Sequence, residues 1–360
     1  MTELTPARRT WRIFKRNKIA IAGLAFIGLT ILVAVLGYLI MPDSTPMANN
    51  MTIQLSIKKP GSAFMMLRLP KGEPVDTVNF FTKMLYGQPS FYRDVPITGY
   101  RFTKDSVYVD EYIGPEDKPE RKAYRLPAKV IHKTFLLGTD IYGRDLLSRL
   151  ILGTRISLAV GLMSVIISML LGITIGSVAG YFGGWADAAL SWLMNILWAL
   201  PALLLVIAIS FALGKGLWQI FIAVGLSMWV EVARLVRGQV LSLKQVEYIE
   251  AARSLGFNNT RIITRHILPN IMGPILVLAS SNFASAILLE AGLSFLGFGA
   301  QPPMPTWGSM IKEHYGYIVM DSAYLAIIPG LAIMFLVYAF NLVTVGLRDA
   351  FDIKSQSTRF

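Results

Sequence analysis

The chain has 360 residues, of which 54% are hydrophobic and only 16% are charged, and it contains no cysteine. A soluble domain carries about a quarter charged residues, and the apolar excess here lies in runs of about 20 residues, the length that crosses a bilayer. The net charge of +12 does not indicate a nucleic-acid-binding protein, because many of the lysines and arginines flank the apolar runs on the predicted cytoplasmic side. The absence of cysteine excludes disulfides and cysteine nucleophiles. We therefore expect an all-α polytopic membrane protein.

The first 40 residues predict a basic segment followed by a membrane helix. Residues 1–18 are rich in arginine and lysine, and residues 19–40 are apolar throughout. The apolar run is too long for the hydrophobic region of a signal peptide and is not followed by a small-residue cleavage site. We predict that residues 1–18 lie in the cytoplasm and that residues 19–40 are a retained first transmembrane helix.

Residues 41–135 are polar and predict a β-rich insert. Short stretches alternate between apolar and polar residues, for example YRFTKDSVYV at 100–109, and prolines and glycines separate them. This alternation is typical of strands. The insert follows a helix whose N-terminus is inside, and long loops cross the membrane largely regardless of their charge. We therefore expect a small extracytoplasmic module.

Five further apolar runs complete a prediction of six transmembrane helices. They cover about 156–179, 186–213, 217–235, 273–298 and 323–347. Six crossings place both termini in the cytoplasm, with residues 350–360 as a tail, and the positive charges between 234 and 265 fall on that side as well. We expect a multi-pass protein of the cell membrane, inner or plasma. The chain has no Gly-x-x-x-x-Gly-Lys-Ser/Thr loop with which to cradle ATP.

A polar segment between two of these runs predicts a docking surface. Its defining residues are Glu250, Ala251, Ala252, Gly256, Leu268 and Pro269. Residues that favour helix formation precede Gly256. Glycine is suited to the end of a helix because it adopts positive φ without steric cost. Asn258, Asn259 and Thr260 offer cap side chains for a second helix, which Leu268 and Pro269 should end. The small alanines would let another backbone approach closely. The alternative is an ordinary pair of surface helices.

The spacing of these residues resembles the EAA loop of ABC-importer membrane subunits. Other stretches are similar to the second permease type of the oligopeptide/dipeptide/nickel branch, namely LGTDIYGRD at 137–145, EAGLSFLGFG at 290–299, QPP and WGS between 301 and 309, and FN with GLRD between 340 and 349. The resemblance implies the fold of a type I ABC-importer permease. Its five-helix core would cover residues 136–349, with the coupling loop at 237–272.

This resemblance also implies a function and a set of partners. The chain would form half of a pore for di- and oligopeptides, beside a homologous second permease. Two cytoplasmic ABC ATPase subunits would bind ATP and magnesium and would engage the EAA residues, and an extracytoplasmic binding protein would deliver the peptide. The chain itself would bind no cofactor or metal and would not be an enzyme.

Three residues are candidates for the pore or its gate. Glu290 is ionisable and lies within a predicted span, where a charge usually faces a cavity or a partner, although hydration near the membrane surface is an equal alternative. Pro201 should kink its span. Asn341 belongs to the last stretch that resembles the family.

Other classes of function would require different sequence features. Import of nickel or another peptide-like solute is the nearest alternative. An ATPase-independent secondary transporter or channel would carry charges in several spans, and a membrane enzyme would group catalytic residues at one depth. Asp140, Arg144 and Asp145 cluster with no histidine or nucleophile in register with them, and we expect a structural network or a contact with the binding protein. The histidines lack metal-ligand spacing, and we expect His132, His266 and His314 on the surface.

Overall fold

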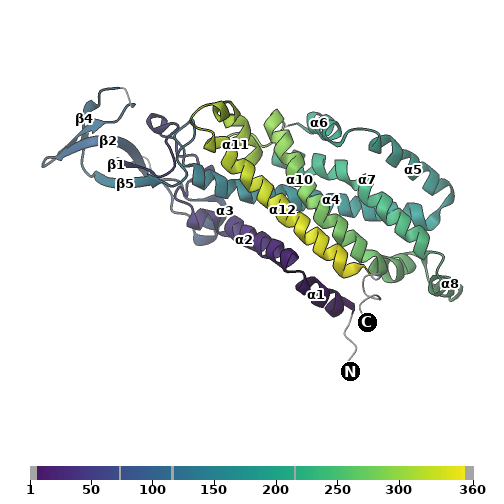
Figure 1. Ribbon diagram of the computed structural model, residues 1–360. Coiled ribbons are helices and arrows are strands. Elements are labelled where there is room, and N and C mark those ends of the chain that lie inside the picture. Colours follow the sequence, from purple (N-terminus) through teal and green to yellow (C-terminus); the bar gives the residue numbers. More distant parts are fainter. Residues whose placement is uncertain (1–5, 73, 115–116, 215, 353–360) are drawn as a thin grey trace. The chain divides into compact units, whose positions relative to one another are not determined.

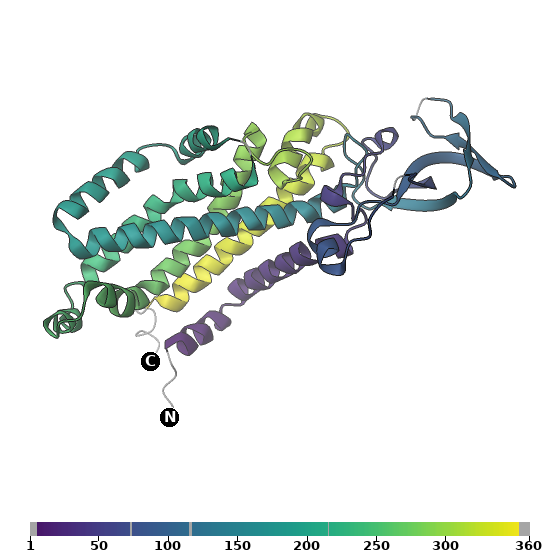
Figure 2. The ribbon, with the colours of Figure 1, turned by 180° about the vertical axis from the view of Figure 1, so that it is seen from behind.

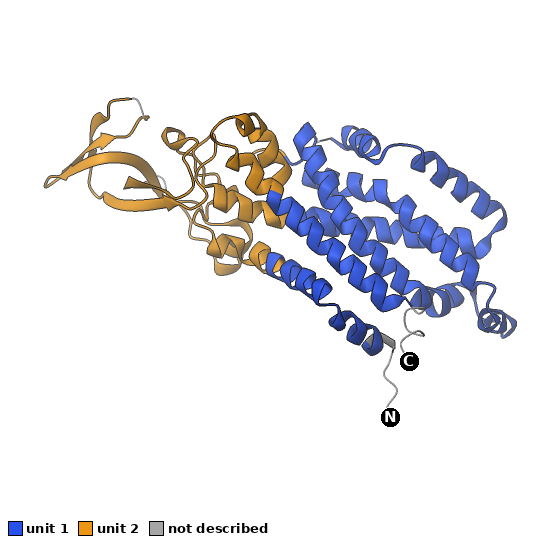
Figure 3. Ribbon diagram, viewed as in Figure 1, with its two compact units in different colours: residues 1–30, 157–300, 331–360 blue, residues 31–156, 301–330 orange. Residues whose placement is uncertain are grey.

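The computed structural model describes residues 6–72, 74–114, 117–214 and 216–352. The chain divides into two compact units (Figure 3). Unit 1 contains residues 1–30, 157–300 and 331–360, and unit 2 contains residues 31–156 and 301–330.

Most of the described chain is helical (Figures 1 and 2). The long helices are α2 (Lys18–Ile40), α4 (Leu146–Phe182), α7 (Leu217–Leu243), α10 (Met272–Leu296) and α12 (Tyr324–Phe351). The shorter ones are α1 (Pro6–Arg16), α3 (Phe80–Tyr86), α5 (Gly184–Trp198), α6 (Ala202–Leu213), α8 (Glu247–Ser254), α9 (Asn259–Arg261) and α11 (Trp307–His314). Tight 3-10 turns lie at Pro46–Ala48, Ile53–Leu55, Leu268–Ile271 and Tyr315–Val319, and Ile262–Ile267 is π-helical.

The predicted membrane spans are confirmed with one change. Among the described residues, five helices are long and apolar enough to cross a membrane, and the bent pair α5 and α6 makes a sixth if it counts as one span. The pair is bent by 97°. The expected kink at Pro201 is thus a complete break, with Pro201 as the N-cap of α6. Proline donates no backbone hydrogen bond, so the chain can turn there without losing one.

In unit 1, α4 packs closely against α7 through a row of glycines. Gly172, Gly176 and Gly180 are spaced four residues apart and share one face of the helix. A Cβ atom on Gly172 would lie 2.4 Å from Cβ of Val232, and one on Gly176 would lie 2.4 Å from the carbonyl oxygen of Ala233. Small residues at this spacing let membrane helices approach closely and pack by van der Waals contact.

Unit 2 contains the β-rich insert, whose predicted character is confirmed. Its antiparallel sheet has five strands in the order β4-β3-β2-β1-β5. The strands are β1 (Ser62–Pro70), β2 (Tyr92–Phe102), β3 (Ser106–Glu111), β4 (Glu120–Arg125) and β5 (Lys129–Phe135). The alternating stretch at 100–109 forms the hairpin between β2 and β3, and Val107 and Val109 pack in the core beside Leu67 of β1. Phe102, another apolar residue of the same alternating stretch, is exposed.

Candidate functional site

The polar segment after α7 begins as the sequence predicts. α8 is followed by Gly256 with φ +79°, a left-handed conformation that residues with a Cβ adopt only at a cost. Asn258 then caps α9, because its side-chain oxygen accepts a hydrogen bond from the Arg261 amide at 2.8 Å. The predicted helix, turn and start of a second helix are therefore confirmed.

The predicted end of the second helix is wrong. Leu268 and Pro269 lie in a 3-10 turn that leads directly into α10, so one helical segment runs from Asn259 to Leu296. A wider π-helical stretch precedes this turn. Because the backbone hydrogen bonds change spacing on both sides of Pro269, its missing N–H and its ring are accommodated where a regular α-helix would break.

Two residues of α8 face the chain's own core. Ile249 and Ala252 are buried against Ile262 and Ile267 of the following turns. Ala252 therefore sets how closely α8 approaches its own core, and it does not lie on the surface that a partner would meet.

The opposite surface of α8 is free in this chain. Glu250 and Ala251 are exposed there. Tyr248 and Leu255, which were not predicted from the sequence, are 42% and 74% exposed, and the Tyr248 hydroxyl accepts a hydrogen bond from the Asn270 side chain at 3.2 Å. Their spacing of two helical turns places them on one side of the helix, a signal that could have found them. Charge at Glu250 and apolar surface at Leu255 together suit docking against another protein.

Tyr181, near the end of α4, connects this segment to the membrane helices. Its hydroxyl donates a hydrogen bond to Oδ1 of Asn259 at 2.9 Å. The charged groups of Arg253 and Lys244 lie 5.6 and 5.8 Å from the centre of its ring. Cations over an aromatic face are attracted to it. One side chain thus contacts residues on both sides of α8, and displacement of α8 would act on α4.

Glu290 is held inside unit 1. It is fully buried in α10. The Ser294 hydroxyl donates to Oε1 at 2.7 Å, and the Ser157 hydroxyl of α4 donates to Oε2 at 3.4 Å. Intramembrane carboxyl groups are stable when such partners replace water. This geometry favours a role in joining α4 to α10 over an open pore or a hydrated surface.

Glu231, a carboxylate that was not among the predicted pore residues, is exposed, whereas Glu290 is buried. Glu231 lies well inside the membrane-length helix α7, is exposed, and has no hydrogen bond or ion pair among the described residues. One turn further on, Arg234 donates to Oδ1 of Asn195 on α5 at 2.8 Å. Asn341, the remaining pore candidate, is exposed on α12. An acid within the apolar run 217–235 was the available signal for Glu231.

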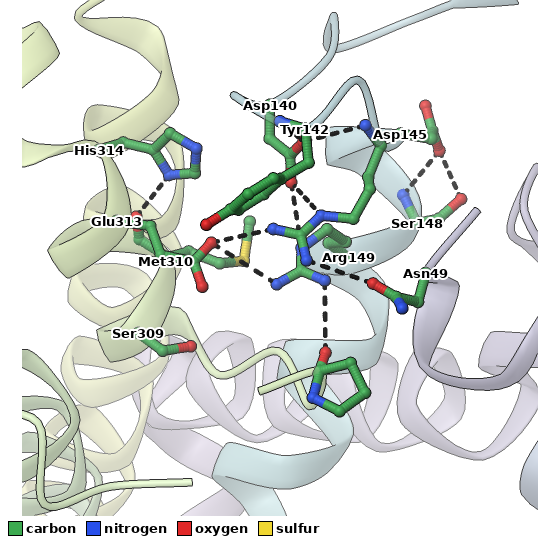
Figure 4. Close-up of polar contacts among 12 residues, drawn as sticks. Asn49, Asp140, Tyr142, Asp145, Ser148, Arg149, Ser309, Met310, Glu313 and His314 are labelled. Carbon is green, nitrogen blue, oxygen red and sulfur yellow. Dashed lines mark hydrogen bonds and ion pairs between the residues drawn. The ribbon is translucent and has the colours of Figure 1, made fainter. Parts of the chain in front are cut away.

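Unit 2 contains a buried cluster of charges (Figure 4). Nε of Arg144 lies 2.6 Å from Oδ2 of Asp140, and its Nη2 lies 3.0 Å from Oε2 of Glu313. Arg149 contacts the same two carboxylates at 3.5 and 3.8 Å. Two guanidinium groups therefore face two carboxylates, and the buried charges are balanced. The structural network expected around Asp140 and Arg144 is present, and it extends to Arg149 and Glu313.

The backbone before α4 builds this cluster. Oδ1 of Asp140 accepts hydrogen bonds from the amides of Tyr142 and Arg144, both at 2.9 Å. Asp145 accepts from the amide of Ser148 at 2.9 Å and from its hydroxyl, which satisfies the first turn of the helix. Burial raises the pKa of the Asp145 carboxyl, although both Ser148 contacts act in the opposite direction.

The expectation that His314 lies on the surface is wrong, because it is fully buried beside the charge cluster. Its Nδ1 lies 2.7 Å from the carbonyl oxygen of Met310, so the tautomer with a proton on Nδ1 donates there, and its buried Nε2 has no partner in the described structure. Burial lowers its pKa and favours the neutral ring. The position follows from α11, where Trp307 donates to the Leu150 carbonyl of α4 at 3.0 Å.

A metal ion fits this cluster poorly. Asp140, Glu313 and His314 offer ligand atoms that lie within 4.8 Å of one another. Both carboxylates already bind Arg144 and Arg149, whose positive charges would repel a cation. The arrangement instead ties α11 to the start of α4.

Comparisons with known proteins match most of the chain. A family model described as binding-protein-dependent transport system inner membrane component matches residues 172–355, and one for the N-terminal TM domain of oligopeptide transport permease C matches residues 5–56. The chain is 48% identical over 221 residues to the glutathione transport system permease protein GsiD of Pectobacterium atrosepticum, which covers 61% of this chain and 73% of that protein.

The chain is also similar to a second permease and to a solved transporter structure. The chain is 44% identical over 220 residues to the dipeptide transport system permease protein DppC of Alkalihalophilus pseudofirmus, covering 61% of this chain and 72% of that protein. A chain of the MetNI methionine ABC transporter in an inward facing conformation gives a TM-score of 0.47 at 18% identity, over 57% of this chain and 97% of that one.

Proposed function

We propose a function from one premise: this chain belongs to the family of binding-protein-dependent transport system inner membrane components. It is a multi-pass membrane permease of the peptide branch, as the resemblance of its motifs predicts. Within that family, we propose that it forms half of the pore of an ATP-driven importer of di- or oligopeptides. Relatives named for glutathione and dipeptide transport support a small peptide or peptide-like solute.

The proposed partners follow from what the chain offers and lacks. It has no phosphate-binding loop, so ATP and magnesium would bind to two ABC ATPase subunits in the cytoplasm. Glu231 is exposed within a membrane helix without a partner in the described structure, which supports a second permease and a shared polar path beside α7. An extracytoplasmic binding protein would deliver the substrate.

The free surface of α8 is the observation that carries the coupling proposal. Glu250, Ala251 and Leu255 would dock on the ATPase subunits, while Ala252 remains packed against the chain's own core. Closure of the ATPases would displace α8. Tyr181 and the helical segment from Asn259 to Leu296 would carry that displacement to α4 and α10. The chain would contribute no catalytic group of its own.

Co-purification tests this proposal. The full chain would be expressed with its candidate ATPase and permease partners and purified by a tag on the chain. We expect the ATPase to co-purify with the wild type and with Ser254→Ala, a control on the same helix. A Glu250→Lys, Leu255→Asp double variant should lose the ATPase and keep the second permease. Equal ATPase recovery in all three proteins would refute docking through this surface.

The proposed orientation places both termini and α8 in the cytoplasm of the cell membrane and the insert outside. Because the chain has no cysteine, single introduced cysteines report its topology. We expect Ser106→Cys to react with an impermeant thiol reagent in intact cells whose outer membrane, if present, has been permeabilised. Ser254→Cys should react only after lysis. The reverse pattern would contradict the six-span topology.

A further inference from the structure

Helix α3 leaves most of its apolar side chains uncovered. Phe80, Phe81, Leu85 and Tyr86 are 61%, 69%, 44% and 70% exposed, although the helix has only seven residues. Successive residues turn by about 100° around a helix. Phe80, Phe81 and Leu85 therefore lie on one side of α3 with Met84, and Lys83 points away from them. Such a surface needs an apolar or interfacial environment.

The end of α3 is fixed to the end of membrane helix α2, within unit 2 (Figure 1). A Cβ atom on Gly87, the C-cap of α3, would lie 2.7 Å from Cε1 of Tyr38 and 2.6 Å from the carbonyl oxygen of Ser44. The amide of Gln88 donates to that same carbonyl at 2.9 Å. Only glycine fits between these groups, so α3 sits where α2 ends at Ile40.

A second membrane helix also holds α3. Nη1 of Arg155, on α4, donates to the carbonyl oxygens of Met84 at 3.2 Å and Leu85 at 2.9 Å. These carbonyls belong to the last turn of α3, where no intrahelical partner is available and positive charge is favourable. The guanidinium group also lies 6.0 Å from the centre of the Tyr38 ring. The position of α3 beside both membrane helices is therefore specified by side-chain contacts.

The apolar surface of α3 continues the exposed apolar surface of α2. In the part of α2 that belongs to unit 2, the exposed apolar residues are Ile31, Leu32, Val35, Leu39 and Ile40. On a membrane span this surface meets lipid, and the exposed aromatic residues of α3 lie where that span ends. Aromatic side chains concentrate at the membrane–water interface, where short amphipathic helices lie with their apolar side toward the acyl chains.

We infer that α3 is an interfacial anchor that lies in the phospholipid head-group region of the leaflet where α2 ends. Phe80, Phe81 and Leu85 contact the acyl boundary, and Lys83 remains among the head groups. β2 begins shortly after α3, at Tyr92, so the anchor also fixes the first residues of that strand at the membrane surface. This inference needs only a membrane-spanning α2 and is independent of the transported solute and of the ATPases.

Spin-label accessibility tests the anchor in the full chain. Single cysteines would be introduced at Phe81 and at Thr82, which lies on the other side of α3, with Val35 as a lipid-exposed control and Lys104 as an aqueous control. The labelled protein would be placed in nanodiscs of phosphatidylethanolamine and phosphatidylglycerol. Collision with oxygen reports lipid, and collision with a water-soluble nickel chelate reports solvent.

The expected result is that the Phe81 label resembles Val35, with high oxygen and low nickel accessibility, while the Thr82 label is shifted toward nickel. A Phe81 label as accessible to nickel as Lys104 would overturn the inference, because α3 would then lie in water. A Phe81 label shielded from both reagents would overturn it as well, because a protein surface would then cover α3. Substituting Arg155 by Gln should raise nickel accessibility at Phe81 and leave Val35 unchanged.

Discussion

Gly256 offers the sharpest test of the coupling loop, because its backbone conformation is restrictive while the space around it is open. Its φ is +79°, yet a Cβ placed on it would meet no atom within 4 Å. A substitution there strains only the backbone, by about 1–2 kcal/mol for a residue in the left-handed region. Asparagine tolerates that region best among residues with a side chain, and a β-branched residue tolerates it worst.

We therefore expect uptake to fall in the order Gly256, Asn, Ala, Val. A strain of about 1–2 kcal/mol reduces the population of the correctly capped α8 by about 5- to 30-fold if an alternative conformation is available. The assay is uptake of a labelled dipeptide, with immunoblotting of membranes to confirm insertion. Gly214→Val is the matched control, because Gly214 has φ +86° and equally open surroundings but lies at the end of α6.

Normal transport by Gly256→Val would refute a role for this glycine in coupling. An equally strong loss of uptake in Gly214→Val would refute it too, because the loss would then reflect general strain and not the coupling loop.

Three further predictions test other parts of the structure. Gly176→Val places a Cβ atom 2.4 Å from the Ala233 carbonyl oxygen and should lower the stability of the protein by about 1–3 kcal/mol. The loss would appear as a lower melting temperature in detergent. Gly28→Val, on an open surface, should leave the melting temperature unchanged. Burial lowers the pKa of His314, so the unfolded chain binds more protons than the folded chain as the pH falls below about 6.5. The stabilising contribution of the neutral ring is therefore full above that pH and declines below it. His314→Asn should remove this part of the decline, and an unchanged profile of stability against pH would contradict the prediction. Glu231→Gln should lower uptake about tenfold by removing the charge-assisted contact that Glu231 would make in the proposed polar path, with the complex still assembled, and unchanged uptake would exclude Glu231 from the path.

The spans could be predicted because each depends on its own residues. An apolar run of membrane length is visible in the sequence, and so are Gly256 as a helix stop and a helix cap among residues 258–260. Pro201 predicts a break by itself, but the 97° bend depends on how α5 and α6 pack. Pro269 is a local signal that failed, since π and 3-10 turns around it keep the chain helical.

The positions of the candidate site residues depend on contacts distant in sequence. His314 is buried because α11 packs on the start of α4, and no local pattern reveals that contact. Glu290 is enclosed because Ser157 and Ser294 meet it from α4 and α10. The two alanines of the EAA pattern look equivalent in sequence, yet Ala252 faces the core and Ala251 faces outward. Helical phase relative to Ile249 distinguishes them, and that phase becomes meaningful once the buried side is known.

Uptake into proteoliposomes tests the central claim most directly. The purified chain with its permease and ATPase partners would be reconstituted, the binding protein and labelled dipeptide added outside, and ATP with magnesium or a non-hydrolysable analogue enclosed within. Our account predicts dipeptide accumulation only with hydrolysable ATP inside, and its loss in the Glu250→Lys, Leu255→Asp variant. Accumulation that needs no ATP and follows an imposed proton or sodium gradient would contradict the account and identify a secondary transporter.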